Sequence, residues 1–123
     1  MKTLKTWHPN ADRQTAFTCE ITCEGLRFVH ERTEYVIPWT TVFRVFRKAC
    51  ELADDEGLVR AGARMDNPPP ESLGEWVAQE QLSIRPGTLT PRHLSFLGPA
   101  LGELGLVERE IRGNAIYWRL SCD

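Results

Sequence analysis

The chain has 123 residues, 41% hydrophobic and 26% charged, a composition typical of one globular domain that buries a real core. Its net charge of −2 and isoelectric point of about 5.9 count against a strong non-specific grip on DNA, but do not exclude a local basic surface. No apolar run is as long as a membrane span, and the first ten residues lack the apolar segment of a secretory signal. We therefore expect a cytoplasmic protein with no membrane partner, folded as a single compact domain over residues 1–123.

The residues at 16–37 predict a small antiparallel β meander that follows a frayed N-terminal tail. In AFTCEITCEG, alternate residues share one face, which is the period of a half-buried strand: Phe17, Cys19, Ile21 and Cys23. A turn at Glu24-Gly25 then leads to two further short strands, LRFVH and EYVIPW. The alternation points both cysteines inward as small buried thiols. Cys50 and Cys122 stand alone, so the second pair of a zinc site is missing and we expect no metal.

A helix is predicted over residues 40–54, where apolar residues recur at helical spacing: Val42, Val45, Phe46, Ala49, Leu52 and Ala53. Thr40 or Thr41 is expected to cap its start, and Gly57 to follow its end in the left-handed conformation. The meander and this helix make up a first sub-region, residues 16–57.

Residues 58–71 predict a connector that Pro68, Pro69 and Pro70 stiffen into an extended form, with a short helix or strand at Leu58–Arg60. Ser72 then predicts the cap of a second helix, with Glu75 three residues on completing a capping box. Leu73, Trp76 and Val77 line one face of that helix, and SIRPGT after it predicts a turn.

Residues 90–104 predict a third helix, because Thr90-Pro91 is a strong start signal and four leucines form one stripe: Leu94, Leu97, Leu101 and Leu104. Gly98-Pro99 lies inside the stripe, and is expected to kink or split the helix because proline cannot donate to the carbonyl of Ser95. Gly105 is expected to end it. Two strands, LVEREI and AIYWRL, then follow as a hairpin with its tip at residues 112–114.

A helix, a turn and a second helix that ends in leucine and glycine before a hairpin resemble the winged helix-turn-helix superfamily. The residues that carry the resemblance are Leu101, Leu104, Gly105, Leu106 and Val107, and the wing would be residues 108–120. The resemblance covers residues 72–120, and reaches the helix at 40–54 if that helix is the first of a three-helix core. It implies an α+β fold, in which the small N-terminal meander plus helix is followed by a winged-helix-like unit over 72–123 with a C-terminal β hairpin.

The resemblance implies DNA binding by the helix at 90–104 and by the wing. Between Ile84 and Leu120 five arginines outnumber three glutamates, and arginine is the residue type that makes bidentate contacts with phosphate and guanine, although Glu108 and Glu110 flank Arg109. The candidate DNA-binding residues are Arg85, Thr88, Thr90, Arg92, His93, Ser95, Arg109, Arg112, Asn114, Tyr117 and Arg119. A continuous basic strip over Arg85, Arg92, Arg112 and Arg119 would favour DNA, whereas an exposed apolar patch would favour a protein partner.

No catalytic constellation occurs in the sequence: there is no phosphate-binding glycine loop, no HExxH and no GxSxG, and the three histidines are scattered. We expect a protein that is not an enzyme, with no catalytic residues and no cofactor. The leading hypothesis is a transcriptional regulator that binds double-stranded DNA as a homodimer. Two alternatives on the same fold stay open: a protein–protein interaction module, and a phage- or plasmid-borne inhibitor of a host protein.

Overall fold

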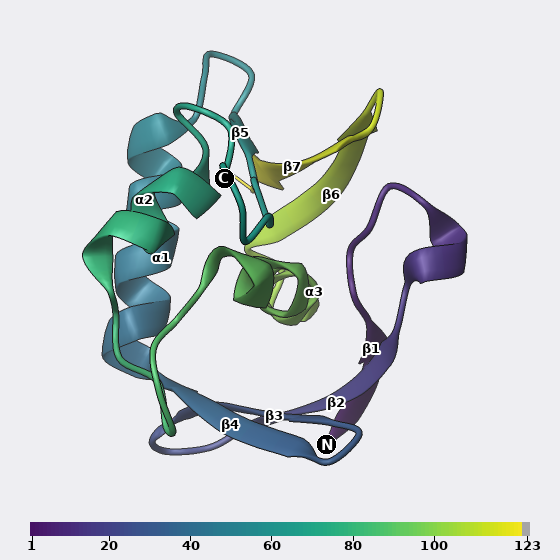
Figure 1. The fold of residues 1–123 in the computed structure, drawn as a ribbon, viewed down its shortest axis with the longest axis vertical. Helices are drawn as coiled ribbons and strands as arrows, with labels where there is room; N and C mark the ends of the chain where they lie inside the picture. Colours follow the sequence, from purple (N-terminus) through teal and green to yellow (C-terminus); the bar gives the residue numbers. More distant parts are fainter. Residues whose placement is uncertain (122–123) are drawn as a thin grey trace.

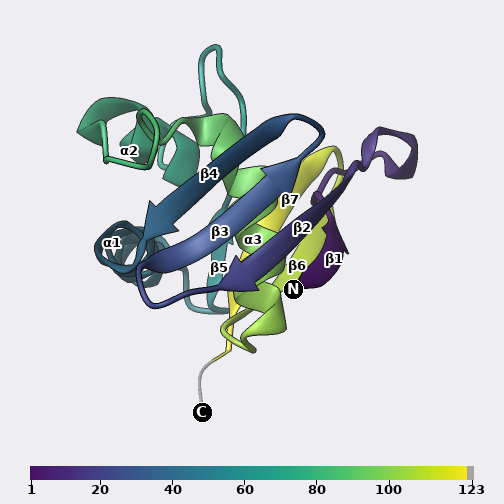
Figure 2. The same ribbon diagram turned by 90° about the horizontal axis from the view of Figure 1, so that it is seen from below.

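The computed structural model of the chain describes residues 1–121. Two antiparallel sheets lie on opposite sides of a central helix, α3 (Leu94–Glu103), while α1 (Trp39–Leu52) and α2 (Leu73–Glu80) close one flank (Figures 1 and 2). The fold is α+β, as expected. No helix in the described part of the chain is long and apolar enough to cross a membrane.

The first sheet contains four consecutive antiparallel strands: β1 (Lys2–Lys5), β2 (Ala16–Ile21), β3 (Gly25–His30) and β4 (Thr33–Pro38). The last three confirm the expected meander. The expectation that the N-terminal residues fray is wrong, because β1 pairs with β2 from Lys2 opposite Cys19 to Lys5 opposite Ala16. With Leu4 as its only strongly apolar residue, KTLK carries almost no alternation by which a strand can be recognised.

The alternating face of β2 is buried only over its first half. Phe17 and Cys19 are buried as predicted, but Ile21 is 62% exposed and Cys23 is exposed, so the predicted inward placement is confirmed for Cys19 and wrong for Ile21 and Cys23. β2 ends at Ile21, and the Thr22 hydroxyl accepts hydrogen bonds from the N–H groups of Glu24 and Gly25, both at 3.2 Å. This hydroxyl-closed turn ends the strand geometry before Cys23.

Helix α1 begins directly after Pro38 and has no side-chain cap, so the predicted cap by Thr40 or Thr41 is wrong. Thr41 is buried, and its hydroxyl donates instead to the carbonyl of Ser83 at 2.9 Å. The apolar stripe is confirmed, since Val42, Val45 and Ala49 are buried.

The predicted role of Gly57 at the end of α1 is also wrong. The helix ends at Leu52, and the Asp54 carboxylate accepts from the N–H groups of Glu56 and Leu58 at 2.8 and 3.0 Å. Gly57, with φ of +77°, therefore belongs to the turn that leads into the next strand.

The second sheet has the strand order β5 (Leu58–Arg60), β7 (Ala115–Leu120) and β6 (Val107–Arg112). The predicted C-terminal hairpin is confirmed, with the two-residue loop Gly113-Asn114 and a φ of +62° at Gly113. For Leu58–Arg60 the sequence predicts either a short helix or a strand. The structure has the strand β5 there, and it pairs with β7. Trp118 of β7 is fully buried between this sheet and the helices.

Helix α2 begins at the predicted cap, because the Ser72 hydroxyl accepts from the N–H of Glu75 at 3.2 Å. The second half of the expected capping box is displaced by one residue. The Glu75 carboxylate accepts from the N–H of Glu71 at 3.1 Å, while the N–H of Ser72 bonds to the carbonyl of Pro69.

Helix α3 follows a short 3₁₀ turn, η2 (Pro91–His93), and ends in the left-handed glycine that the sequence predicts. Gly105 has φ of +77°, its N–H bonds to Gly102, and the N–H of Leu106 bonds to Leu101, which together form a Schellman cap. The first three leucines of the stripe are buried. Leu104 is 38% exposed because it lies at the cap, beyond the last helical turn.

The predicted split of α3 at Gly98-Pro99 is wrong, because the helix is continuous from Leu94 to Glu103. Pro99 leaves the carbonyl of Ser95 without its helical donor, and the backbone N–H of Trp7 donates to that carbonyl at 3.0 Å. The six-membered ring of Trp7 lies across Gly98 and Gly102, so close that a Cβ on Gly98 would be 2.6 Å from Trp7 Cε3. Gly98 and Pro99 thus form the site at which the N-terminal segment packs on α3.

Candidate functional site

The outer face of α3, which is the face expected to enter a DNA groove, is covered by the first sheet. Phe96 packs edge-on against Phe17 with ring centroids 5.1 Å apart, and against His30 at 5.3 Å. The His93 ring, just before the helix, packs on Tyr35 of β4 at 4.9 Å. Residues 97–101 are buried without a break. In this structure α3 is a core helix, and it does not protrude as a groove-reading helix would.

The predicted polar contacts at the start of α3 are used within the protein. His93 Nδ1 accepts from the backbone N–H of Thr90 at 2.9 Å, and the Ser95 hydroxyl donates to the carbonyl of Arg92 at 2.7 Å. Burial lowers the pKa of His93 below its usual range and so favours the neutral ring that this hydrogen bond requires. Thr88 is exposed and forms an isolated backbone bridge with Ser83.

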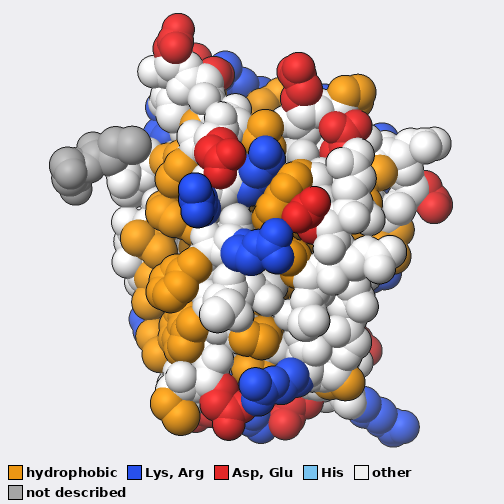
Figure 3. Space-filling view, turned by 90° about the vertical axis from the view of Figure 1, so that its left-hand side faces the viewer, with side chains coloured by type: hydrophobic (Ala, Val, Ile, Leu, Met, Phe, Trp, Pro, Cys, Tyr) orange, Lys and Arg blue, Asp and Glu red, His pale blue; other side chains and the backbone are white. Residues whose placement is uncertain are grey.

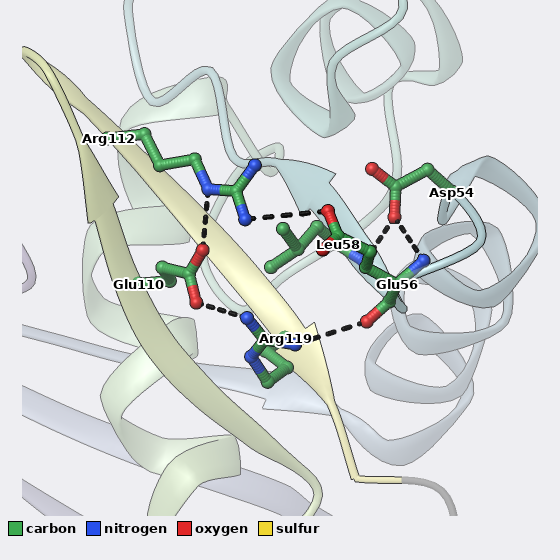
Figure 4. Close-up of polar contacts among 6 residues, drawn as sticks. All are labelled: Asp54, Glu56, Leu58, Glu110, Arg112 and Arg119. Carbon is green, nitrogen blue, oxygen red and sulfur yellow. Dashed lines mark hydrogen bonds and ion pairs between the residues drawn. The ribbon is translucent and has the colours of Figure 1, made fainter.

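Two of the three wing arginines, Arg112 and Arg119, are held by carboxylates (Figure 4). Glu110 accepts from Arg112 Nε at 2.6 Å and from Arg119 Nη2 in a short contact. Arg112 also reaches the Glu56 carboxylate at 3.5 Å, and Arg119 donates to the Glu56 carbonyl at 3.2 Å. Arg119 first, and then Arg112, hold the pKa of Glu110 below its usual range. These contacts tie the wing to the 54–58 turn and neutralise much of its positive charge.

The expected basic strip is therefore largely compensated, since three of its four arginines contact carboxylates. Arg85 pairs with Glu24 in the β2–β3 turn at 2.7 Å, while Arg112 and Arg119 share Glu110. Arg92 is exposed and has no hydrogen bond or ion pair from its side chain within residues 1–121. The same is true of Arg109 on β6, and Tyr117 is half-buried in β7.

A different surface brings together arginines that contact no carboxylate of residues 1–121. Two pockets of about 970 and 380 Å³ adjoin each other, and together we name them the arginine groove. Their walls come from the N-terminal segment at 6–15, the loop that follows β5, the start of α3 and the tip of the wing. The residues common to both pockets are Trp7, His8, Arg13, Ala63 and Ser95.

Four arginines line the groove: Arg13, Arg60 and Arg64 in the larger pocket, and Arg13 and Arg92 in the smaller. All four are exposed, and none forms an ion pair within the described residues. Within residues 1–121, no aspartate or glutamate lines either pocket. A cleft lined by charge of one sign focuses its field, so the groove attracts anions although the net charge of the chain is negative.

The floor of the groove adds polar and aromatic groups. Trp7 and His8 are half-buried and line both pockets, and Asn10 and Asn114 line the larger one. Two lining residues have a buried ring nitrogen with no hydrogen-bond partner in the described chain: Nε1 of Trp118 and Nε2 of His30. Such groups are costly to bury unpaired.

Three of the predicted site residues lie in this groove: Arg92, Ser95 and Asn114. Sequence reasoning missed Arg13, Arg60 and Arg64, although RAGAR at 60–64 places two arginines around a glycine just before the proline run. A comparison of the chain with protein-family models, curated proteins and solved structures found no match.

Proposed function

We propose that the protein binds nucleic acid, and that it does so through the arginine groove rather than through the covered face of α3. The observation that carries this proposal is a groove lined by four arginines that form no ion pair within residues 1–121, and by no acidic residue of that range. Phosphate neutralisation by arginine and lysine supplies most of the non-specific affinity for nucleic acids. The net charge of the chain is −2, so we assign the affinity for phosphate to the basic groove whose charge is not compensated within the described residues.

A winged-helix-like arrangement and a role in transcriptional regulation belong to the same proposal. Three helices precede the hairpin of β6 and β7, and the α3 end with Gly105 has the form that carries the resemblance. The four-stranded sheet that covers α3 is an addition to that arrangement. Because this sheet covers α3, it favours a nucleic-acid contact at a surface beside the wing.

The test is binding of fluorescein-labelled mixed-sequence oligonucleotides at low salt, followed by anisotropy. Replacing Arg60 and Arg64 together by alanine is expected to weaken binding at least about tenfold, because hydrogen bonds to charged groups contribute roughly 1.5–3 kcal/mol each. Arg32→Ala is the matched control: this exposed arginine of the β3–β4 turn also lacks an ion pair in the described chain, but lies outside the groove. The proposal fails if nothing binds at tens of micromolar, or if the double variant binds like the Arg32 control.

A second candidate function is binding of a protein partner, and the exposed side of α1 is the observation that favours it. Phe43 is 63% exposed and stacks on Trp39 with centroids 6.0 Å apart, and Trp39 Nε1 donates to the Thr22 carbonyl beside the exposed Ile21. Hydrophobic side chains lie among charged ones on the α1 and α2 side of the molecule (Figure 3). This surface is where we place the proposed homodimer contact. Sedimentation of the wild type and of Phe43→Ser tests it: a loss of self-association in the variant supports the contact, and identical monomers contradict it.

A further inference from the structure

We infer that the occupant of the arginine groove is a single strand of nucleic acid rather than a duplex. The inference rests on the proposed function and names the form of nucleic acid that the site accepts. Four properties of the groove carry it: its concave shape, the lack of a protruding helix, the spread of its arginines and its aromatic residues.

The shape of the site is that of a cleft. At about 970 and 380 Å³, the two pockets have the size of cavities that hold small-molecule ligands, which also suits individual nucleotide units. A duplex is a stiff rod with a persistence length of about 50 nm, and it cannot bend into such pockets. A single strand is flexible enough to follow them.

The helix that would recognise a duplex is also not accessible. A helix that reads the major groove has to project from the protein, and α3 is buried between the two sheets. Two wing arginines that would contact the flanking phosphates, Arg112 and Arg119, are engaged by Glu110, as Figure 4 shows. Four arginines without an ion pair in the described chain line the groove instead: Arg13, Arg60, Arg64 and Arg92.

The arginines are distributed along the groove rather than gathered around one point. Arg60 and Arg64 line only the larger pocket, Arg92 lines only the smaller, and Arg13 lines both. One phosphate group would need a convergent set of donors. Cations that line two adjoining pockets match the repeated phosphates of a single strand.

The aromatic groups complete the match. Trp7 and His8 line both pockets, and bases of any sequence stack on such rings because every base has a π-face. Trp7 is held in advance, since its N–H bonds to the Ser95 carbonyl and its ring lies on Gly98 and Gly102. A single strand of nucleic acid would therefore contact a Trp7 ring that is already held in place beside the arginines.

The experiment compares one labelled 12-nucleotide strand of mixed sequence with the duplex that the same strand forms with its complement. We expect the strand to bind at least about tenfold more tightly than the duplex. His8→Ala should weaken strand binding at least about fivefold, roughly 1 kcal/mol for one lost stacking contact. Among the residues that the structure describes, the His8 ring forms one hydrogen bond, which it accepts from the N–H of Asn10. This variant should therefore fold, and its thermal midpoint checks that. Lys5→Ala, an exposed cation on β1 outside both pockets, is the control.

The outcomes separate the inference from the proposed function. Duplex binding that equals or exceeds strand binding overturns the inference and leaves nucleic-acid binding intact. Full displacement of the strand by micromolar nucleoside monophosphate, with affinity independent of strand length, overturns it in favour of a pocket for a single nucleotide. An unaltered strand affinity in His8→Ala overturns the stacking that the inference requires. If neither strand nor duplex binds, the proposed function itself falls.

Discussion

At the scale of single residues, the two cysteines near the β2–β3 turn show what alternation in a sequence can and cannot predict. The period of two correctly places Phe17 and Cys19 in the core. It fails at Cys23, because the point where a strand ends depends on a local hydrogen bond of Thr22 that apolar patterning does not encode. The two thiols therefore differ strongly in environment, and burial raises the pKa of Cys19 to about 11.

This difference predicts selective alkylation by iodoacetamide in the native protein at pH 8. Cys23 should react at least about tenfold faster than Cys19, because thiolate fraction and access both control the reaction rate. Peptide mapping by mass spectrometry measures the two rates. Comparable rates in urea are the control, and comparable rates without urea would contradict the buried position of Cys19.

His93 predicts a pH dependence of stability. Burial lowers its pKa in the folded state, so the unfolded chain takes up the proton first as the pH falls through about 6.5. The contribution of neutral His93 is therefore complete above that pH and is lost below it. Urea unfolding at pH 7.5 and 5.0 should show a smaller acid loss in His93→Gln than in the wild type. An equal loss in both proteins would show that His93 is not the group that titrates.

At the scale of elements, α3 shows how a distant segment can repair a local defect. The local signals of the helix were sufficient to predict its proline start, its leucine stripe and its glycine cap. They also predicted a split at Pro99, which does not occur, because the missing donor comes from Trp7 at the other end of the chain. A window of neighbouring residues contains no information about that donor.

The packing of Trp7 on α3 predicts an energetic coupling between the two elements. Gly98→Ala should destabilise the fold by about 1–3 kcal/mol, since the new methyl group would overlap the Trp7 ring. In a Trp7→Ala background the same substitution should cost less, with a coupling of roughly 0.5 kcal/mol or more. A double-mutant cycle from urea unfolding measures the coupling, and strictly additive costs would contradict the contact.

At the scale of the whole molecule, the predicted elements are almost all present, but their packing moves the candidate site. The sequence predicts the meander, three helices and the hairpin from local patterns, whereas β1 and β5 are too short to carry such a pattern. That the first sheet covers α3 depends on contacts between distant aromatic residues such as Phe17 and Phe96. The same packing brings together arginines from separate segments of the chain. Arg92 is predicted because it lies in the segment that resembles a winged helix, whereas Arg13, Arg60 and Arg64 lie outside that segment.

The most direct measurement of the groove as a nucleic-acid site is the salt dependence of strand binding. Each phosphate neutralised on a single strand contributes about −0.7 to the slope of log K against log salt concentration, so four arginines predict a slope of about −3. Replacing Arg60 and Arg64 by alanine should make that slope shallower by about 1.4, and Arg32→Ala should leave it unchanged. A wild-type slope near zero, or one that the groove variant and the Arg32 control change equally, would contradict the arginine groove as the binding site.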